Sequence, residues 1–204
     1  MIKNKTNLAI FASGNGSNFE SLIKAIKKGK INVAKSILFT DKKNAFVRKR
    51  AKKQKIKDIF IDPAQFKDKK KFDQEIIKVL NKEKITVIAL AGYMRILSPF
   101  FVKYFKNKIL NIHPSLLPSF PGNNAIEDAF NYGSKITGVT IHFVNNEVDQ
   151  GPIIAQKPVE VKDKMSLEAL EKKIHQTEHK LYPQILKLFL ENKIKLEGRH
   201  VKII

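Results

Sequence analysis

Short apolar runs alternate with helix-like segments through the first half of this chain, and this alternation constrains the fold more than any other feature. The apolar runs that we assign to buried strands are Asn7–Ala12, Val33–Phe39, Ile59–Ile61, Thr86–Ala91 and Ile109–Ile112. The segments between them with a helical pattern are Phe19–Lys28, Ala45–Lys53, Lys70–Glu83 and Pro99–Phe105. Buried strands that alternate with helices are joined by right-handed crossovers. The sequence therefore predicts an α/β fold with a doubly wound, mostly parallel sheet and helices on both faces.

The last third of the chain follows a different pattern. Ile136–Val144 and Pro152–Val161 are strand-like with no long helix between them, so we expect an antiparallel extension at one edge of the sheet. Ser166–Asn192 predicts a long helix with its first residue as the N-cap and a kink or break at Pro183. Two further runs, expected to form a terminal hairpin, are Ile194–Leu196 and Val201–Ile204. No linker divides the chain, which predicts a single domain over residues 1–204.

Composition excludes several classes of protein. Hydrophobic residues make up 43% of the 204 residues, which is too many for a globally disordered chain. No apolar run reaches the roughly 18 residues that a membrane-spanning helix needs. The N-terminal residues lack the apolar stretch of a signal peptide, and without cysteine the chain has neither disulfides nor thiolate metal ligands. We therefore expect a cytoplasmic protein with no membrane partner.

The net charge of +20 raises the question of nucleic-acid binding. Of the 39 basic residues, 35 are lysine and only four are arginine, at positions 48, 50, 95 and 199. Nucleic-acid readers favour arginine for its bidentate fork and combine it with aromatic residues. Here the lysines are spread along nearly every amphipathic segment. This pattern indicates solvated faces and a positive field that attracts anionic small molecules, and it predicts no nucleic-acid partner.

Residues 12–18, with the sequence ASGNGSN, connect the first strand directly to the first helix. Gly16 permits a tight turn, while Asn15, Ser17 and Asn18 supply hydrogen-bond donors beside a helix N-terminus. The third glycine of a dinucleotide loop and the lysine of a Walker loop are both missing. An ordinary βα turn capped by Ser17 or Asn18 is the alternative. We interpret residues 12–18 as a cradle for a phosphomonoester and call them the phosphate loop.

Asn111 and His113 end one strand-like run, and Asp149 lies in a polar turn between the two later strands. The two-residue period of a strand places Asn111 and His113 on the same face. An amide can stabilise a developing oxyanion, an imidazole can transfer a proton near neutral pH, and a carboxylate can raise the pKa of that imidazole. Alone, each has a structural alternative, a strand-end histidine or an Asx turn. Together they predict acyl transfer to an amine.

The other histidines and one apolar loop complete the set of candidates. On its strand His142 is expected opposite Phe143, in a solvent-facing or structural position. His175 and His179 have metal-ligand spacing but no third ligand, so we predict no metal. Residues 90–98 follow the fourth strand, and their exposed apolar part suits an aromatic heterocycle or the packing of the next helix. We expect this loop, the phosphate loop and the Asn111/His113 loop to converge at the carboxyl ends of the strands.

Four motifs together resemble the phosphoribosylglycinamide formyltransferase family. They are residues 14–18 (GNGSN), 90–98 (LAGYMRILS), 112–118 (IHPSLLP) and 148–151 (VDQG), in order and over essentially the whole chain. The resemblance implies transfer of a formyl group from the co-substrate 10-formyltetrahydrofolate to the amine of phosphoribosylglycinamide in de novo purine biosynthesis. It implies small-molecule substrates and no metal. We expect a monomer or a weak homodimer.

The resemblance also assigns roles to individual residues. In catalysis, Asn111 and protonated His113 would stabilise the oxyanion, and Asp149 would favour the imidazolium and order water for proton transfer. The phosphoribosylglycinamide site would comprise Asn15, Gly16, Ser17, Asn18, Gly92, Met94 and Glu178. The folate site would comprise Lys69, Met94, Arg95, Ile96, Leu97, Asn111 and Val144. Lys69 stands where the family carries arginine, which keeps the charge near the glutamate tail but loses the bidentate fork.

Two positions depart from the family pattern. After Gly122 the family typically has a histidine two residues on and often another two further, whereas this chain has Asn124 and Ile126. A formyltetrahydrofolate hydrolase and a catalytically degenerate folate-binding protein are therefore the alternatives. Methionyl-tRNA formyltransferase and formyltetrahydrofolate deformylase usually carry an additional domain, for which we expect no room in this chain.

Overall fold

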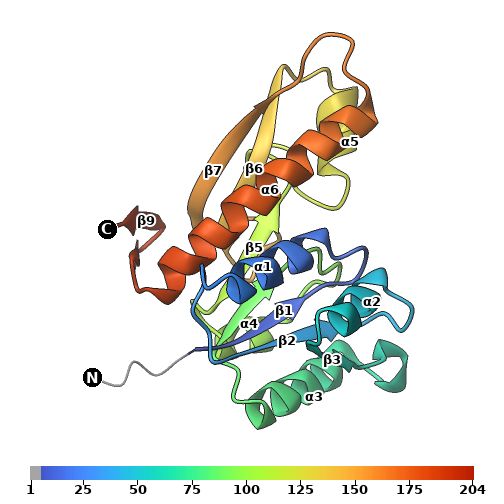
Figure 1. The fold of residues 1–204 in the computed structure, drawn as a ribbon, viewed down its shortest axis with the longest axis vertical. Coiled ribbons are helices and arrows are strands. Elements are labelled where there is room, and N and C mark those ends of the chain that lie inside the picture. The colour runs from blue at the N-terminus through green and yellow to red at the C-terminus, as the bar shows by residue number, and fades with distance from the viewer. Residues whose placement is uncertain (1–5) are drawn as a thin grey trace. The chain divides into compact units, whose positions relative to one another are not determined.

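The computed structural model describes residues 6–204, which form two compact units, one ending at Leu110 and the other spanning Asn111–Ile204 (Figure 1). The elements that begin in the first unit are β1 (Asn7–Phe11), α1 (Ser17–Lys27), β2 (Lys35–Thr40), α2 (Phe46–Lys53), β3 (Lys57–Phe60), the 3-10 helix η1 (Pro63–Gln65), α3 (Lys69–Lys82), β4 (Val87–Leu90), α4 (Pro99–Tyr104) and β5 (Ile109–His113). Every strand and helix predicted for this half is present, with small shifts at the ends. Only η1 was not expected.

Parallel pairing sets the strand order of the first unit. β1 pairs with β2 on one side and β4 on the other, and β2 also pairs with β3. The resulting order is β3-β2-β1-β4, with β5 next. The chain thus runs outward from β1 to β3 and returns to β4 across β1. In open α/β sheets, ligands bind at the carboxyl ends of the strands beside such a reversal.

Helices cover both faces of these strands. α1 packs against α2, and α3 packs against α4. Right-handed crossovers on the two sides of β1 place these pairs on opposite faces (Figure 1). Between them the ring of Phe11 contacts those of Phe39 and Tyr93, with centroids 4.4 and 5.2 Å apart. This aromatic cluster anchors the end of β1, where the phosphate loop begins.

The second unit holds the remaining elements: the end of β5, α5 (Ala125–Asn131), β6 (Ile136–Phe143), β7 (Ile153–Glu160), α6 (Leu167–Leu190), β8 (Ile194–Glu197) and β9 (His200–Ile203). The strand order continues β5-β6-β7, and β6 pairs with β7 antiparallel. α6 packs along β6 and β7 (Figure 1). β8 and β9 form the predicted terminal hairpin. The predicted fold class, including the antiparallel extension, is confirmed.

Helix α6 begins as predicted and runs through Pro183 to Leu190. The Ser166 side chain accepts a hydrogen bond from the Ala169 amide at 3.2 Å, which is an N-cap. No break occurs at Pro183, although proline has no N–H to donate to the preceding turn. The buried side chains of Tyr182 and Ile185 on either side pack this part of the helix into the core. Tertiary packing therefore outweighs the local cost of the proline.

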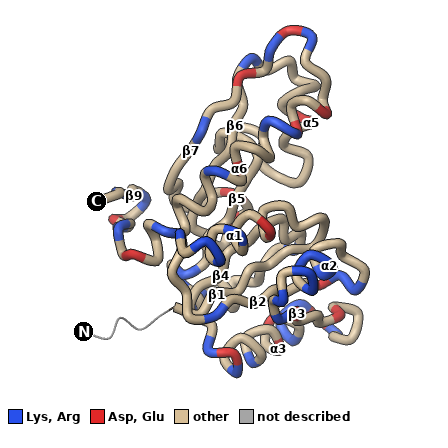
Figure 2. The backbone as a smooth tube through the Cα atoms, in the orientation of Figure 1, with Lys and Arg blue, Asp and Glu red and all other residues tan. Residues whose placement is uncertain are grey.

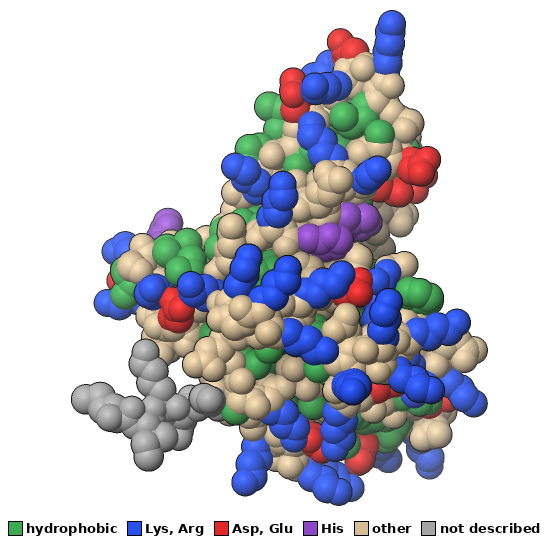
Figure 3. Space-filling view, viewed as in Figure 1, with side chains coloured by type: hydrophobic (Ala, Val, Ile, Leu, Met, Phe, Trp, Pro, Cys, Tyr) green, Lys and Arg blue, Asp and Glu red, His purple; other side chains and the backbone are tan. Residues whose placement is uncertain are grey.

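The basic residues are distributed over both units rather than gathered in one region (Figure 2). On the face seen in the space-filling view, lysine and arginine side chains alternate with acidic, polar and apolar ones (Figure 3). This distribution matches the expectation of solvated helix faces. Across residues 6–204, no helix is both long and apolar enough to cross a membrane.

Candidate active site

Asn111, His113 and Asp149, predicted to act together, lie side by side in the second unit. The Nδ1 atom of His113 is 3.4 Å from Oδ2 of Asp149. The Nδ2 atom of Asn111 is 3.5 Å from Oδ1 of the same carboxylate. Alternate residues of β5 thus both face Asp149, as the two-residue period requires. The carboxylate bridges the amide and the imidazole.

Asp149 owes its position to an unusual backbone conformation. Its φ is 56°, in the left-handed region that aspartate tolerates better than most residues. The Oδ2 atom also accepts a hydrogen bond from the backbone N–H of Gly122 at 2.9 Å. The turn after β6 is therefore tied to the loop after β5, and the carboxylate is held in place before any ligand binds.

His113 is buried and is engaged at both ring nitrogens. Its Nε2 lies 2.8 Å from the carbonyl oxygen of Phe120, which can only accept, so Nε2 carries a hydrogen. The other nitrogen, Nδ1, faces Asp149. Both nitrogens therefore face acceptors, an arrangement complementary to a doubly protonated ring. The site holds a proton donor in place.

His142 was expected to be solvent-facing or structural, and a solvent-facing position is wrong. Its side chain is buried, and its Nε2 lies 3.1 Å from Nδ2 of Asn111 and 3.7 Å from Oδ1 of Asp149. The prediction assumed that one face of β6 meets solvent. Instead β6 lies between β5 and β7, and every residue from Thr137 to Phe143 is buried. Strand alternation cannot place a side chain in water on a strand that is covered on both faces.

His142 orients the amide of Asn111. Burial lowers the pKa of His142, opposed by its hydrogen bond to the Phe143 carbonyl and by the charge of Asp149. That 2.8 Å bond assigns the ring hydrogen to Nδ1, which leaves Nε2 as an acceptor. Asn111 therefore directs Nδ2, not Oδ1, toward His142. Its second N–H has only the long 3.5 Å contact with Asp149 and can be redirected to a ligand.

The phosphate loop has the backbone that its glycines predict. Gly16 has a φ of 77° and is the N-cap of α1, without a side-chain cap. The alternative of a cap by Ser17 or Asn18 is therefore not observed. A Cβ on Gly16 would lie 2.3 Å from the Val47 side chain, and the Val47 amide donates to the Gly14 carbonyl at 3.1 Å. The loop is packed against the start of α2.

The phosphate loop and the loop after β4 meet through Ser13. Its backbone N–H donates to the carbonyl of Gly92 at 2.9 Å, and its hydroxyl accepts from the amide of Met94 at 3.0 Å. The same hydroxyl donates to Asp41 at 2.6 Å. These two loops therefore converge beside the strand reversal, as predicted. Their convergence with the Asn111/His113 loop stays a prediction.

The apolar residues of the loop after β4 divide into exposed and buried ones. Met94 and Ile96 are 57% and 60% exposed, whereas Leu97 is buried. The guanidinium of Arg95 lies over the ring of Phe72, 5.1 Å from its centroid. Residues 94–96 thus expose two large apolar side chains and a cation, while Leu97 is part of the core.

The remaining predicted folate residues lie on other elements. Lys69 is the first residue of α3, exposed, and follows Asp68, whose side chain caps the helix by accepting from the Lys71 amide at 2.8 Å. Val144 follows β6 and is half-buried. Lys69 presents its charge beside a helix N-terminus, a position suited to an anion.

Glu178 is buried on α6 and is paired with a histidine one turn away. Its Oε2 lies 2.8 Å from Nδ1 of His175, and this hydrogen bond raises the pKa of His175. The rings of His175 and His179 are stacked 6.4 Å apart. Throughout the part of the chain that the structure describes, no three His, Asp or Glu side chains form a group able to hold a metal ion.

The positions that depart from the family pattern begin a helix that was not predicted. Asn124 is the N-cap of α5, exposed and without a side-chain cap bond, and Ile126 is half-buried in the first turn. The segment gave no sequence signal because α5 is short and has no side-chain cap. The equally short α4 differs in beginning with the capping Ser98 and with Pro99, which mark a helix start.

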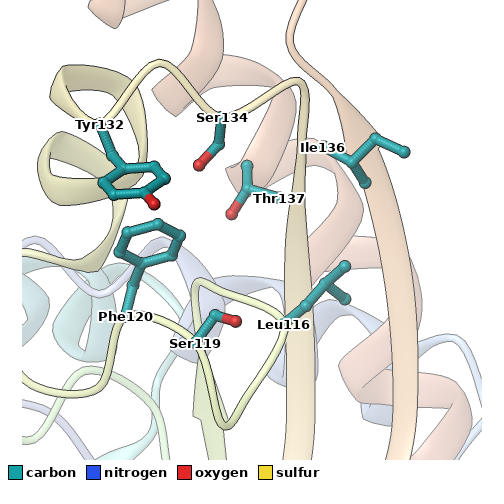
Figure 4. Close-up of a pocket in the computed structure, with 7 residues that line it drawn as sticks. All are labelled: Leu116, Ser119, Phe120, Tyr132, Ser134, Ile136 and Thr137. Carbon is teal, nitrogen blue, oxygen red and sulfur yellow. The ribbon is translucent and has the colours of Figure 1, made fainter.

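A cavity of about 470 Å³ lies in the second unit (Figure 4). Its lining consists of uncharged side chains, from Leu116, Ser119, Phe120, Tyr132, Ser134, Ile136 and Thr137. None of the predicted site residues is among them. Phe120 belongs both to this lining and to the surroundings of His113. Its ring contacts Tyr132, and its carbonyl accepts the hydrogen bond from His113.

Comparisons with known proteins agree with one another. The Formyl transferase family matches residues 6–186. The phosphoribosylglycinamide formyltransferase of Bacillus subtilis (strain 168) is 43% identical over 182 residues, covering 89% of this chain and 93% of that protein. Glycinamide ribonucleotide transformylase 1 from Symbiobacterium toebii superposes with a TM-score of 0.95 at 35% identity, covering 98% and 95% of the two chains. For phosphoribosylglycinamide formyltransferase from Bacillus halodurans the TM-score is 0.88 at 42% identity, with 91% and 95% covered.

Proposed function

The chain belongs to the formyl transferase family, and we propose that it transfers the formyl group of 10-formyltetrahydrofolate to the amine of phosphoribosylglycinamide in de novo purine biosynthesis. The similar proteins from Bacillus subtilis and Symbiobacterium toebii bear names for this activity. The observation that carries the proposal for this chain is the buried cluster of Asn111, His113 and Asp149. In this cluster Asn111 can donate a hydrogen bond to an oxyanion, and His113 can act as an acid whose position is fixed by Asp149.

The residues present fit a folate co-substrate. A pterin is a flat heterocycle, and Met94 and Ile96 offer exposed apolar surface at the carboxyl end of β4. A folate tail carries carboxylates, and Lys69 would supply positive charge for it, while Arg95 would line the pterin pocket with Ile96 and Leu97. When bound, 10-formyltetrahydrofolate supplies an electrophilic formyl carbon. The chain's own residues bind it, orient it and move the proton.

In this mechanism the negative charge that develops on the formyl oxygen is stabilised by two donors. His113 donates from Nε2, because Nδ1 is turned to Asp149. Asn111 donates the Nδ2 hydrogen that has only the long contact with Asp149, while His142 keeps the other hydrogen and the amide orientation. Donors that the fold orients before the reaction lower the cost of reorganisation, although the Nε2 hydrogen of His113 must first leave the Phe120 carbonyl.

Asp149 faces Nδ1 of His113 and is proposed to help pass on the proton of the attacking amine. It is fixed by the Gly122 amide, so its carboxylate keeps its place as charge moves. Water ordered by this carboxylate would relay the proton from the amine to the departing folate nitrogen. General acid–base help of this kind contributes about 10²–10⁴-fold to the rate.

The phosphoribosylglycinamide site is proposed to combine three segments. Residues Asn15 to Asn18 supply backbone and side-chain donors at the N-terminus of α1 for the phosphate. Gly92 and Met94 belong to the adjoining loop that Ser13 ties to this cradle. Glu178 on α6 would contact the ribose or the amine.

The proposal also covers the domain organisation, the partners and the cellular compartment of the protein. Residues 1–204 would act as one formyltransferase domain, because the family match of residues 6–186 runs through both units. The expected partners are small-molecule substrates, with a monomer or a weak homodimer as the working form. The absence of cysteine keeps the cytoplasm as the expected compartment.

The first test follows tetrahydrofolate formation from a 10-formyl folate, with and without phosphoribosylglycinamide. Wild type should turn over only with the acceptor, and His113→Ala should lower kcat by about 10²–10⁴-fold because the general acid is lost. His200→Ala, at an exposed histidine of β9, is the control and should retain full activity.

Other outcomes contradict the proposal. Turnover without acceptor would identify a formyltetrahydrofolate hydrolase. Folate binding without any turnover would identify a degenerate binding protein and would assign the loss to Asn124 and Ile126.

A further inference from the structure

Arg50 on α2 binds the phosphate loop through hydrogen bonds to Asn15. The Nε atom of Arg50 donates to the backbone oxygen of Asn15 at 2.9 Å, and its Nη2 donates to the side-chain Oδ1 of the same residue at 2.9 Å. Its Nη1 pairs with the carboxylate of Glu20 on α1. One planar guanidinium therefore fixes both oxygens of Asn15.

We propose that Arg50 is a positioning residue that turns Asn15 into a hydrogen-bond donor for the substrate phosphate, an inference that rests on the proposed function. A carboxamide has an acceptor at one end and two N–H donors at the other. Because Oδ1 is bound to Arg50, Nδ2 is directed away from it. An ionised phosphate accepts hydrogen bonds and repels other acceptors. The amide orientation that Arg50 imposes is therefore the one a phosphate can use.

The backbone contact has the same effect on the next N–H. A trans peptide unit is planar, so its N–H points opposite to its carbonyl. With the Asn15 carbonyl held by Arg50, the N–H of Gly16 points away from Arg50. Gly16 reaches this geometry with a φ of 77°, and its lack of a Cβ leaves room for the Val47 side chain packed against it. Arg50 thus sets one side-chain and one backbone donor together.

The effect is geometric rather than electrostatic. Glu20 pairs with Arg50, and both side chains are largely shielded, at 20% and 23% exposure. The charge of the guanidinium is therefore already compensated on the α1 side. A lysine would keep this charge, but its single ammonium lacks the fixed fork that reaches two oxygens of Asn15 and the carboxylate at once.

Arg48 is a matched control on the same helix. Its Nε pairs with Asp58 at 2.7 Å and its Nη1 donates to the Lys43 carbonyl at 2.6 Å. Arg48 thus resembles Arg50 in type, helix, ion pairing and contact with a backbone carbonyl. Both of these partners lie outside residues 12–18. A comparison of Arg50→Lys with Arg48→Lys isolates the contact with Asn15.

The test measures steady-state kinetics and direct binding for wild type, Arg50→Lys and Arg48→Lys. Arg50→Lys should raise KM for phosphoribosylglycinamide about tenfold, as loss of a charged hydrogen bond predicts. Its kcat and its KM for the 10-formyl folate should change little. Calorimetric titration with ribose 5-phosphate should give a matching loss of affinity. Arg48→Lys should behave as wild type in all of these measurements.

A double-mutant cycle shows whether Arg50 acts through Asn15. Asn15→Ala should weaken ribose 5-phosphate binding, and adding Arg50→Lys to it should have little further effect. Additive losses, or an Arg50→Lys protein with wild-type KM and affinity, would overturn the inference. If wild type shows no acceptor-dependent turnover, the proposed function fails instead. The titration and the cycle then still test Arg50 by themselves.

Discussion

His142 is kept neutral because the cost of burying a charge at its position exceeds the attraction of Asp149. Burial is the largest influence on its pKa, which lies below the ordinary value of 6.5. A neutral ring can accept the Nδ2 hydrogen of Asn111 at 3.1 Å, whereas a protonated ring would meet that donor with a second donor. The orientation of the Asn111 amide, and with it the oxyanion site, therefore depends on a histidine that stays uncharged.

This environment predicts how stability depends on pH. With a lowered pKa in the folded state, the unfolded chain binds the proton more readily, so stability rises with pH through this range. The contribution of His142 is fully present above 6.5 and is lost as pH falls through the lowered value. The thermal unfolding midpoint of wild type should therefore fall more steeply between pH 7 and about pH 5 than that of His142→Phe.

His175 is the comparison for His142, because its pKa is shifted in the opposite direction. Glu178 raises its pKa, so its contribution is present at low pH and is lost as pH rises through the raised value. Because its side chain is 48% exposed, solvent screens the effect and it should be small. His175→Gln should leave the acid decline unchanged. Parallel pH curves for wild type and His142→Phe would contradict the assignment of a neutral buried histidine.

At the scale of elements, the junction between the phosphate loop and α2 should be intolerant of any side chain on Gly16. Gly16→Ala combines a left-handed φ of 77° with a Cβ only 2.3 Å from Val47. The backbone cost is about 1–2 kcal/mol, and overpacking adds about 1–3 kcal/mol. Chemical denaturation should therefore show a loss of about 2–5 kcal/mol in the free energy of unfolding.

Gly29 separates these two costs. It has a φ of 69°, and a Cβ there would have no heavy atom within 4 Å. Gly29→Ala should show the backbone cost alone, whereas in Gly16→Ala the new Cβ also lies within 2.5 Å of both the Cγ2 and the Cβ of Val47. Equal losses for the two glycine variants would mean that the contact with Val47 has no energetic weight.

The sequence predicts elements with long periodic patterns and misses those that depend on context. Alternating runs identified β1 to β5 and the helices between them, because each pattern extends over enough residues. α5 was missed because it is short and lacks the capping serine and proline that mark the start of α4. Whether α6 breaks at Pro183 and whether His142 faces solvent were left open by the sequence for a different reason. Both depend on what packs against the element, which local sequence does not encode.

The candidate site also has a part that could be predicted from the sequence and a part that could not. Asn111, His113 and Asp149 could be predicted, since strand period and turn position bring them to one edge. The donors and acceptors that orient them could not. The Phe120 carbonyl and the Gly122 amide act through their backbone, and a backbone group has no residue type that a sequence pattern can reveal.

For the whole molecule, the charge of +20 should affect substrate encounter more than chemistry. Phosphoribosylglycinamide and folates are anionic, and a positive field raises their local concentration. Raising ionic strength from about 0.01 to 0.15 M shortens the Debye length from about 30 to 8 Å, which removes most of this attraction. We expect kcat/KM to fall with added salt while kcat stays constant.

The control for this prediction is an uncharged solute at matched osmolality, which should leave kcat/KM unchanged. A salt-independent kcat/KM would mean that the lysines act only as solvated surface. A fall in kcat instead would place the salt effect on the catalytic step.

The hydrogen bond from His113 to the Phe120 carbonyl has opposite effects on the resting protein and on turnover. In the resting fold it contributes about 1 kcal/mol, as internal hydrogen bonds commonly do. Before Nε2 can donate to a substrate, the same bond must break, and about 1 kcal/mol corresponds to roughly a fivefold slower reaction. The same hydrogen bond thus stabilises the native state and has to be broken during each turnover. Stability and speed are in direct competition at a single carbonyl oxygen.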